Sequence, residues 1–406
     1  MREIILISFL GPDQPHQFTR LMQVLSAHSL QILDVGQAVI HNQLTLGIVV
    51  SSDDQTATAL AMKEMLILAH EIGLTVRFKP ISETDYSQWV SEGGRTRYIV
   101  TALAPELTAS HLQAVTQIVS SQGFNIETVT RLSGRPNLDG TQDEPRRACV
   151  EFGLKGQMLD AAAMRAACLK LSSELNVDVA VQEDNAYRRN RRLVCFDMDS
   201  TLIEQEVIDE LAIEAGVGAQ VAEITERAMQ GELDFQASFR ARVALLKGMD
   251  ASVLPKIAER LTITEGAERL ISTLKALGYR TAILSGGFQY FAEYLQAKLG
   301  IDEVHANILD VQDGVVTGEV KGHIVDGARK AFLLEQIAND MGISLEQAIA
   351  VGDGANDLPM LSIAGLGVAF RAKPLVRQNA NQAISSVGLD GVLYLLGVHD
   401  KDLNQA

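Results

Sequence analysis

The sequence predicts an α/β protein in which a parallel-sheet domain with a helical insert follows two smaller domains of one duplicated fold. The chain has 406 residues, of which 47% are hydrophobic, and this is enough for two or three separate cores. The order strand, helix, strand, strand, helix, strand occurs twice in the first half of the chain. In the second half strands alternate with helices, which is typical of a parallel sheet.

The first small domain is expected over residues 1–82. EIILISFL at 3–10 predicts a strand that ends at the turn GPDQPH, and the apolar residues from Phe18 to Leu25 have helical spacing. Two β-rich runs at 31–40 and 44–52, a helix over about 56–72 and a strand over 74–81 complete the domain.

The second small domain is expected over residues 95–184, because the same order of elements returns about 93 residues later. FLGPD at 9–13 aligns with ALAPE at 102–106, and LQILDV at 30–35 aligns with FNIETV at 124–129, so this is a diverged internal repeat. Polar, glycine-containing segments at 82–97 and 132–147 predict a linker and a long hairpin loop, both exposed.

Charge excludes one class of partner. The chain has 35 basic and 51 acidic residues, a formal net charge of -16, and concentrates basic residues only in RRNRR at 188–192. We therefore expect no nucleic-acid partner. An anionic small molecule would need local cations or a metal ion at its site.

The cysteines and the hydropathy pattern indicate a reducing, aqueous setting. Cys149, Cys168 and Cys195 are far apart, form no C-x-x-C pair and lie in apolar or helical contexts, so we expect reduced core residues. No window reaches 18 uninterrupted apolar residues, and the N-terminus lacks a cleavage signal. We expect a cytoplasmic protein that does not contact a membrane.

The third domain is expected over residues 190–400 and holds the candidate chemistry. RLVCFDM predicts a buried strand, residues 207–270 predict a helical cap, and helix-strand alternation follows. Polar residues directly follow three strands, at 197–201, 285–287 and 353–357. Ligands bind at the carboxyl ends of parallel strands, so these segments predict one site.

Asp197 and Asp199 are the first acids of that site. Where a strand breaks into a loop, carboxylates at i and i+2 can turn toward one point, and Asp353 supplies a third. Such an oxygen-rich site suits Mg²⁺. A calcium loop is disfavoured because its sixth and twelfth positions are Leu202 and Ile208, and two merely exposed acids are disfavoured because VCF precedes them.

Four ordered motifs resemble those of the haloacid dehalogenase superfamily: DMDST at 197–201, SGG at 285–287, Lys330, and GDGAND at 352–357. From Val194 to about Val376 the chain is similar, more closely, to phosphoserine phosphatases, with RAMQGELDFQASFRARV in the cap. The resemblance implies a Rossmann-like core and Mg²⁺-dependent hydrolysis of O-phospho-L-serine, the last step of serine biosynthesis.

The resemblance also implies roles for the acids. Asp197 is expected to be the nucleophile that forms an aspartyl-phosphate, and Asp199 the general acid and base. Mg²⁺ is expected on Asp197, Asp353 and the backbone carbonyl of Asp199, with Asp357 organising the waters of the metal.

Four further residues are implied at the phosphate. Ser285, the backbone N–H of Gly286, Lys330 and Asn356 are expected to contact its oxygens. A single lysine in a helix is most often a surface residue, so only the position of Lys330 between the motifs favours the catalytic role.

The cap is expected to select the substrate. Glu206 would hold the ammonium group of phosphoserine, Arg242 would hold its carboxylate, and Met229 and Phe235 would shield the pocket. Ordinary exposed helix charges remain the alternative for Glu206 and Arg242.

The two small domains resemble tandem ACT domains, which are ferredoxin-like modules that bind amino acids. Gly11 and Asp13 at the first turn are the candidate effector site, with serine as the candidate effector, whereas the second copy has Ala104 and Glu106 there. Ordinary turn chemistry is the alternative. A homodimer is expected.

Two other functions compete with this hypothesis. One is a phosphatase or phosphotransferase for another small phosphomonoester, and Glu206 with Arg242 argues for a zwitterion instead. The other is an amino-acid sensor without activity, but none of the four motifs is lost.

Overall fold

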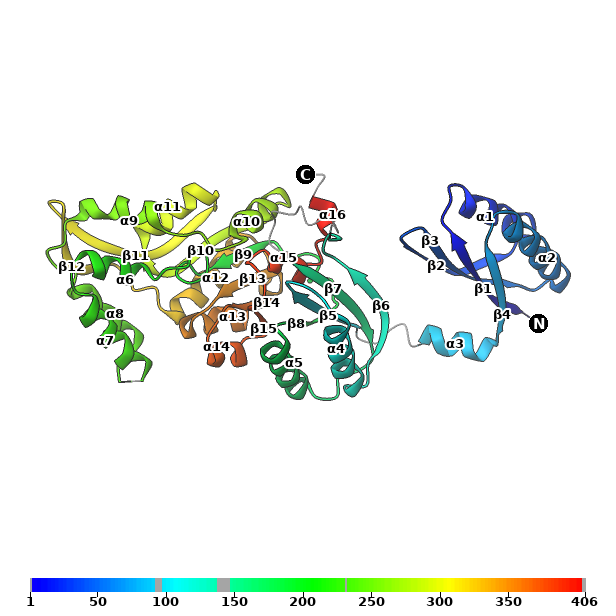
Figure 1. The fold of residues 1–406 in the computed structure, drawn as a ribbon, viewed down its shortest axis with the longest axis horizontal. Coiled ribbons are helices and arrows are strands. Elements are labelled where there is room, and N and C mark those ends of the chain that lie inside the picture. The colour runs from blue at the N-terminus through cyan, green and yellow to red at the C-terminus, as the bar shows by residue number, and fades with distance from the viewer. Residues whose placement is uncertain (1, 92–96, 137–146, 231, 404–406) are drawn as a thin grey trace. The chain divides into compact units, whose positions relative to one another are not determined.

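The structure, a computed structural model, describes residues 2–91, 97–136, 147–230 and 232–403, except for the side chain of Met229. The chain forms two compact units, residues 1–95 and 96–406. Figure 1 labels their helices and strands.

The first unit is an antiparallel sheet of order β2-β3-β1-β4 with two helices on one face. Leu21 and Leu25 of α1 and Ala61 and Met65 of α2 pack with Ile7 of the sheet. The βαββαβ order is the predicted one. Its elements are β1 (Glu3–Pro12), α1 (Gln17–Ala27), β2 (Gln31–Ile40), β3 (Gln43–Ser52), α2 (Gln55–Glu71) and β4 (Thr75–Ile81).

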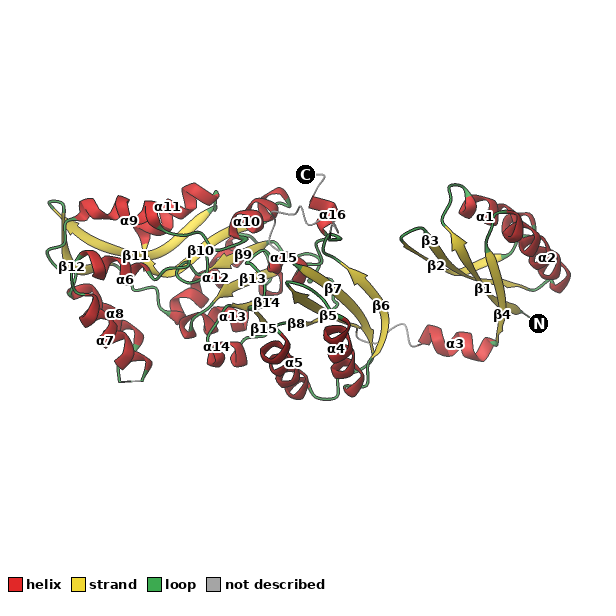
Figure 2. Cartoon of the chain, in the orientation of Figure 1, coloured by secondary structure: helices red, strands yellow, loops and turns green. Residues whose placement is uncertain are grey.

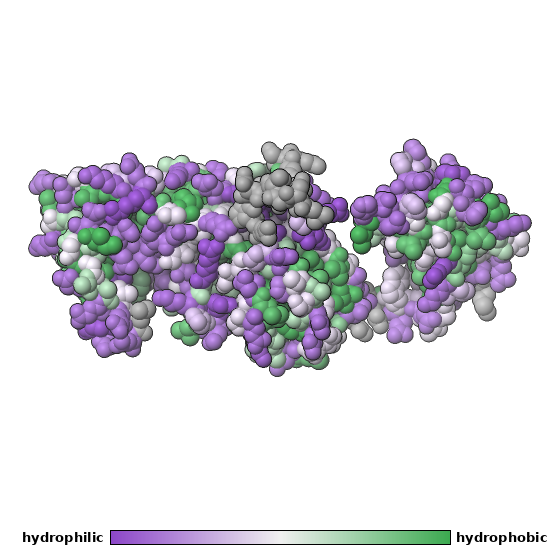
Figure 3. Space-filling view, in the orientation of Figure 1, coloured by the Kyte–Doolittle hydropathy of each residue, from purple (hydrophilic) through white to green (hydrophobic). Residues whose placement is uncertain are grey.

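The edge strand β2 of this sheet is almost entirely exposed. Ile32, Val35, Val39 and Ile40 are each more than a third exposed, and hydrophobic side chains are visible on this unit's surface in Figure 3. The segment after β4 forms helix α3 (Glu83–Ser91), which the linker prediction did not include; it has no buried residue.

The second antiparallel sheet, of order β6-β7-β5-β8, repeats this fold inside the second unit, as predicted (Figure 2). Val115 and Val119 of α4 and Met164 and Cys168 of α5 pack on the sheet. The elements are β5 (Arg97–Ala104), α4 (Ala109–Ser121), β6 (Asn125–Arg131), β7 (Ala148–Lys155), α5 (Ala161–Leu175) and β8 (Asp178–Glu183).

The loop between β6 and β7 is not exposed at its beginning, so that part of the expectation is wrong. Leu132 is 3% and Ser133 6% exposed. The Leu132 N–H donates to the Cys149 carbonyl, and Ser133 Oγ accepts from the Cys149 N–H, which continues the strand pairing into the loop. Residues 137–146 lie outside the described residues.

The third sheet has seven strands in the order β12-β11-β10-β9-β13-β14-β15 and carries the three predicted polar segments. All neighbours are parallel except β12, which pairs antiparallel with β11 in a hairpin that the sequence did not predict. Its strands are β9 (Leu193–Phe196), β10 (Arg280–Phe288), β11 (Glu303–Gln312), β12 (Val315–Lys321), β13 (Ala348–Gly352), β14 (Leu366–Phe370) and β15 (Gln382–Ile384).

Helices cover both faces of this sheet, so β9 is buried along its whole length. The insert after β9 is helical, as predicted, and contains α6 (Val207–Glu214), α7 (Gly218–Met229), α8 (Phe235–Ala244), η2 (Ala251–Val253) and α9 (Leu254–Arg260). The remaining helices are α10 (Ala267–Ala276), α11 (Gln289–Leu299), α12 (Gly327–Asp340), η3 (Leu345–Gln347), η4 (Ala355–Asp357), α13 (Leu358–Ile363), α14 (Pro374–Asn379), α15 (Gly391–Leu395) and α16 (Asp400–Leu403).

Two further expectations can be compared with the structure. Cys149, Cys168 and Cys195 are free and buried, as predicted. In the described part of the chain, no helix combines the length and the apolar character needed to cross a bilayer.

Candidate active site

The site forms where the parallel strands β9 and β13 end, beside residues 285–287 of β10. β9 pairs with β10 on one side and β13 on the other. The Asp197 N–H donates to the Val351 carbonyl at 2.9 Å, so the acid is held by one further ladder bond just past β9. Asp353 directly follows β13, as predicted, but residues 285–287 do not follow a strand: they lie within β10, just past Ile283, the last residue that pairs with β9. The three predicted polar segments therefore still meet at one edge of the sheet.

Lys330 lies between two of the acids. Its Nζ is 2.8 Å from Asp197 Oδ1 and 2.6 Å from Asp357 Oδ1, and its side chain is fully buried. Helix α12 begins at the Asp326 N-cap and directs this lysine inward. The surface alternative for Lys330 is therefore excluded, because a fully buried ammonium is stable only with such partners.

The surroundings shift the acid-base properties of the site. Burial, followed by the charge of Asp357, raises the pKa of Asp197. Burial, followed by the charge of Glu206, raises the pKa of Asp199. Burial and Asp357 raise the pKa of Asp353 to about 7. Burial opposes protonation of Lys330, but Asp197 and Asp357 together raise its pKa above the ordinary value.

The carboxylates of Asp197, Asp353 and Asp357 suit a divalent cation. One oxygen from each lies within 4.8 Å of the others. Three carboxylates are the donor set that hard divalent ions prefer, and such an ion would relieve the repulsion that adds to burial in raising the pKa values of Asp197 and Asp353. Asp199 is not one of these carboxylates; its Oδ1 accepts a hydrogen bond from the Val207 N–H at 3.1 Å.

The second and fourth motifs lie against each other. Ser285 is fully buried, and its Oγ accepts a hydrogen bond from the Gly287 N–H at 2.9 Å. A Cβ at Gly287 would lie 2.5 Å from Asp199 Oδ2, and a Cβ at Gly286 would lie 3.7 Å from Asn356 Nδ2. Because Gly286 and Gly287 have no side chains, Asp199 and Asn356 can lie close to the backbone of β10.

The cap contributes charged and aromatic groups over this edge. Ser200 Oγ donates to Glu206 Oε1 at 2.8 Å. Burial raises the pKa of Glu206 and lowers that of Arg242. The charge of Arg242 partly offsets the rise at Glu206, and the charge of Glu206 partly offsets the fall at Arg242. The Nε of Arg242 is buried without a hydrogen-bond partner. The ring of Phe235 lies 3.0 Å from a Cβ built at Gly286, so the cap reaches the core there.

No ion pair within 4 Å joins Glu206 to Arg242 in the described part of the chain. The two groups nevertheless act on each other electrostatically. This arrangement can accept a ligand with separated positive and negative groups. The side chain of Met229, also predicted here, lies outside the described residues.

Thr201 of the first motif was given no role by the sequence, and two further residues of the site, Asn307 and Lys373, were not predicted. Thr201 is fully buried and its Oγ1 lies 3.3 Å from Asp353 Oδ1. Asn307, 1% exposed, donates from Nδ2 to the Gly286 carbonyl at 2.8 Å and accepts from the Val325 N–H. The charge of Lys373 acts on Glu206. A polar residue within the β-rich run VHANILDV was the only sequence signal for Asn307.

The candidate effector turn has a structural explanation for its glycine. A Cβ at Gly11 would lie 2.8 Å from the Gly73 carbonyl oxygen, so this close approach by itself requires glycine. Asp13 is exposed, and its N–H donates to the Asn42 carbonyl at 2.7 Å.

Family models match two parts of the chain. Residues 194–362 match the haloacid dehalogenase-like hydrolase model and residues 3–79 match the ACT domain model. The first of these ranges contains every active-site residue described above except Lys373.

Known relatives match along almost the full chain. A phosphoserine phosphatase of Streptomyces coelicolor is 40% identical over 408 residues, which cover 99% of this chain and 94% of the relative. Phosphoserine phosphatase SerB2 of Mycobacterium tuberculosis is 40% identical over 403 residues, covering 99% and 95%.

Solved structures share the fold. A haloacid dehalogenase family hydrolase, t0658 of Salmonella enterica serovar Typhi, is 31% identical with a TM-score of 0.64 and covers 73% of this chain and 98% of its own. A probable phosphoserine phosphatase of Vibrio cholerae is 35% identical with a TM-score of 0.59, covering 77% and 90%. The chain therefore belongs to the phosphoserine phosphatase family of haloacid dehalogenase-like hydrolases.

Proposed function

We propose that this protein hydrolyses O-phospho-L-serine to L-serine and inorganic phosphate, with Mg²⁺ as its cofactor. The observation that carries the proposal is the buried constellation of Asp197, Lys330, Asp353 and Asp357 below Glu206 and Arg242 of the cap. The full-length similarity to phosphoserine phosphatases supports the choice of substrate.

Asp197 is the proposed nucleophile. Lys330, 2.8 Å away, favours the ionised form of this carboxylate and offsets repulsion from the phosphate. A carboxylate oxygen of Asp197 attacks phosphorus, the bond from phosphorus to the serine oxygen breaks, and an aspartyl-phosphate forms. Asp197, Asp353 and the backbone carbonyl of Asp199 would hold Mg²⁺, with Asp357 beside it, and the ion would supply further positive charge at the phosphate.

Asp199 is the proposed general acid and base. Its raised pKa favours the protonated form, which can donate a proton to the departing serine oxygen. The resulting carboxylate can then take a proton from the water that attacks the aspartyl-phosphate. The hydrogen bond from the Val207 N–H to Asp199 Oδ1 leaves Oδ2 for this proton.

The remaining predicted residues have binding roles in this proposal. Ser285 Oγ, the Gly286 N–H and Asn356 would donate to phosphate oxygens. Glu206 would hold the ammonium group of serine and Arg242 its carboxylate. Met229 and Phe235 would exclude water from the pocket.

The substrate is tested by phosphate release from phosphoserine, phosphothreonine, phosphoglycolate and a sugar phosphate, each with Mg²⁺ and with EDTA. Phosphoserine should have the highest kcat/KM, and EDTA should abolish turnover. A higher kcat/KM for phosphoglycolate or the sugar phosphate would make the substrate assignment wrong. Asp197→Asn should fold normally and lose turnover by at least about 10³-fold.

We also propose that serine regulates the enzyme through residues 3–79, which match the ACT domain model. Asp13 is a better test than Gly11, because a larger residue at Gly11 would collide with the Gly73 carbonyl and disturb the fold of the unit. Serine inhibition should weaken in Asp13→Ala, and unchanged inhibition would contradict this site.

A homodimer in the cytoplasm is the proposed working form. The exposed apolar side chains of β2 lie on an unpaired sheet edge, which favours self-association. Three free thiols suit a reducing compartment. Light scattering of the eluting protein should give the mass of two chains.

A further inference from the structure

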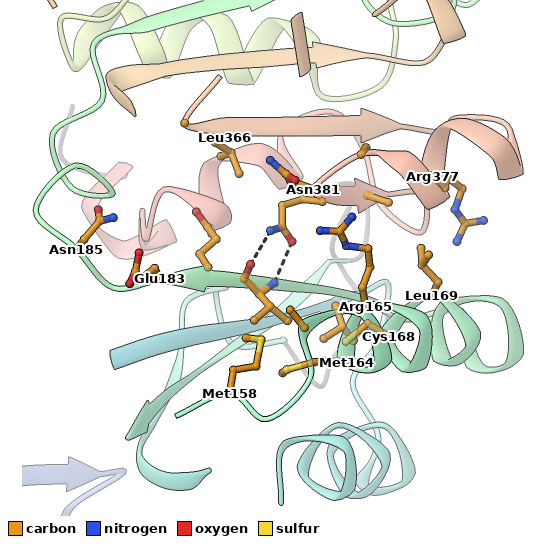
Figure 4. A pocket seen from close by; sticks show the side chains of 18 of the residues that line it. Met158, Met164, Arg165, Cys168, Leu169, Glu183, Asn185, Leu366, Arg377 and Asn381 are labelled. Atoms are coloured by element: carbon orange, nitrogen blue, oxygen red, sulfur yellow. Dashed lines mark hydrogen bonds between the residues drawn. The ribbon is translucent and has the colours of Figure 1, made fainter. Parts of the chain in front are cut away.

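A cavity of about 290 Å³ lies within the second unit, between its two sheets (Figure 4). Helix α5 forms one wall and contributes Met164, Arg165 and Cys168. The opposite wall contains Arg377 of α14 and Asn381 before β15. None of the residues placed in the active site lines this cavity.

The two walls are held together by polar contacts at the edges of the two sheets. The Gln382 side chain donates to the Val181 carbonyl at 2.6 Å and accepts from the Val181 N–H at 2.9 Å, as the dashed lines in Figure 4 show. Asp178, 1% exposed, accepts hydrogen bonds from the N–H groups of Ser385 and Ser386. The cavity is therefore preformed, which reduces the ordering cost of binding.

Three arginines, Arg165, Arg191 and Arg377, line the cavity. In the described part of the chain, none of them has a carboxylate oxygen within 4 Å, although acids outnumber bases by 51 to 35 in the sequence. Most other buried or half-buried arginines of this unit, such as Arg188 and Arg269, are ion-paired.

Arg191 is the most deeply placed of the three, at 6% exposed. Its guanidinium donates only to neutral groups, Gln182 Oε1 at 3.1 Å and the Gly365 carbonyl at 3.3 Å, and its Nε has no partner. Burial, followed by the charge of Arg188, lowers its pKa to about 10, so it remains charged at neutral pH. A buried cation without a counterion is costly, and an anionic ligand would remove that cost.

Arg377, on the wall opposite α5, also donates to a neutral group and lacks a carboxylate partner within 4 Å in the described part of the chain. It donates to Ser172 Oγ at 3.1 Å, and its Nε is buried without a partner. Two acids, Glu183 and Glu346, also line the cavity, but both are exposed. Of the charged residues in the lining, Arg191 is buried and Arg377 half-buried, whereas both acids are exposed.

The rest of the lining is largely apolar on the α5 side. Met158, Met164 and Leu169 lie there, with Cys168 between them on the helix (Figure 4). Methionine side chains adapt to ligands of varied shape. The volume is close to the lower end of cavities that hold small ligands, about 300 Å³.

We propose that this cavity is a second ligand site, which binds a small carboxylate with an apolar body. The carboxylate is recognised by Arg377 and Arg191, with Arg165 at the entrance, and the apolar body packs against Met158, Met164 and Leu169. A planar guanidinium group recognises a carboxylate through two parallel hydrogen bonds, a geometry that other small anions match less well.

The test uses calorimetric titration of the full chain with benzoate and hexanoate, and with benzamide and hexanamide as uncharged probes of similar shape. The parent protein should bind at least one carboxylate with a Kd of about 1 mM or tighter, and should bind its amide at least about tenfold more weakly. Equal binding of the amide, or no carboxylate binding with a Kd of about 10 mM or tighter, would overturn the proposal.

Two variants test whether the carboxylate binds in this cavity. Arg377→Met and Arg165→Met should each weaken carboxylate binding about tenfold or more. Arg165 is exposed and makes no ion pair within 4 Å in the described part of the chain, so its replacement should leave the fold intact. Unchanged affinity in both variants would overturn the proposal.

Two controls separate this site from others. Lys170→Met removes a positive charge from the exposed side of α5, where Lys170 is 73% exposed, and should not alter the affinity. Arg242→Met removes a cation from the active site and should also leave it unchanged. Loss of binding in Arg242→Met with full binding in Arg165→Met and Arg377→Met would place the ligand in the active site and contradict the proposal.

Discussion

Lys330 offers a sharp test of how the active site is held together. Lys330→Met keeps the length of the side chain and removes the ammonium group that lies 2.8 Å from Asp197 and 2.6 Å from Asp357. Removal of one partner from a buried ion pair costs about 3–5 kcal/mol, because the remaining charge is left without compensation. We expect the free energy of unfolding of the second unit, without metal, to fall by about this amount at alkaline pH.

The loss should depend on pH in a definite direction. Burial already raises the pKa of Asp197, and Lys330 opposes this shift, so the variant raises the pKa further. When the pKa of a carboxyl group is higher in the folded than in the unfolded state, the folded protein loses stability as pH rises from the unfolded-state pKa to the folded-state pKa. The difference in stability between variant and parent should therefore grow as pH rises, and should be smaller at pH 5 than at pH 8.

The assay must follow the second unit alone. The single tryptophan, Trp89, lies in α3 of the first unit, so its fluorescence does not report on the site. All three cysteines are buried in the second unit. Thiol reactivity after incubation in urea therefore measures unfolding of that unit, with far-UV circular dichroism as a second probe.

Lys256→Met is the matched control, because Lys256 is exposed on α9. Its unfolding free energy should stay within about 0.5 kcal/mol of the parent. A Lys330→Met loss no larger than that of the control, or a loss of equal size near pH 5 and pH 8, would refute the reasoning. Added Mg²⁺ should restore part of the loss, since it supplies positive charge to the same carboxylates.

Three further predictions concern the site. Because Asp353 has a pKa of about 7 without metal and must lose its proton to bind one, the Mg²⁺ concentration for half-maximal activity should rise by up to about tenfold between pH 7 and pH 6; a constant value would contradict this. Arg242→Met should raise KM for phosphoserine about 10-fold to 100-fold and lower kcat less, and equal KM values in both enzymes would exclude carboxylate recognition. Gly287→Ala should lower kcat at least about 10²-fold, because its Cβ would lie 2.5 Å from Asp199 Oδ2, whereas Gly218→Ala, which has open space, should not; equal rates would show that Asp199 tolerates displacement.

Much of the fold could be predicted because its signals are local. Apolar periodicity and turn residues placed both βαββαβ units, and the buried run before Asp197 placed the central strand. The hairpin of β11 and β12 was missed because its antiparallel pairing is a long-range choice within an otherwise parallel sheet. Leu132 and Ser133 were expected to be exposed, but pairing with Cys149 buries them.

For the active site too, residues with a local sequence signal could be predicted, and contacts between distant segments could not. Two acids directly after a buried strand are visible in the sequence, whereas burial of Lys330 depends on how α12 packs and was expected only from family resemblance. Asn307 supports Gly286 from a distant strand, and no spacing along the chain could indicate that contact. The separation of Glu206 and Arg242, which form no ion pair within 4 Å in the described part of the chain, likewise follows only from the packing of the cap.

The central claim is that Asp197 carries the phosphoryl group during turnover, and trapping that group tests it most directly. Phosphoserine labelled with ³²P is mixed with enzyme and Mg²⁺, quenched in acid within milliseconds, and the protein is digested and mapped. The account predicts an alkali-labile label on the peptide that contains Asp197, absent from Asp197→Asn. Stable label on another residue, or turnover in Asp197→Asn at the parent rate, would contradict it.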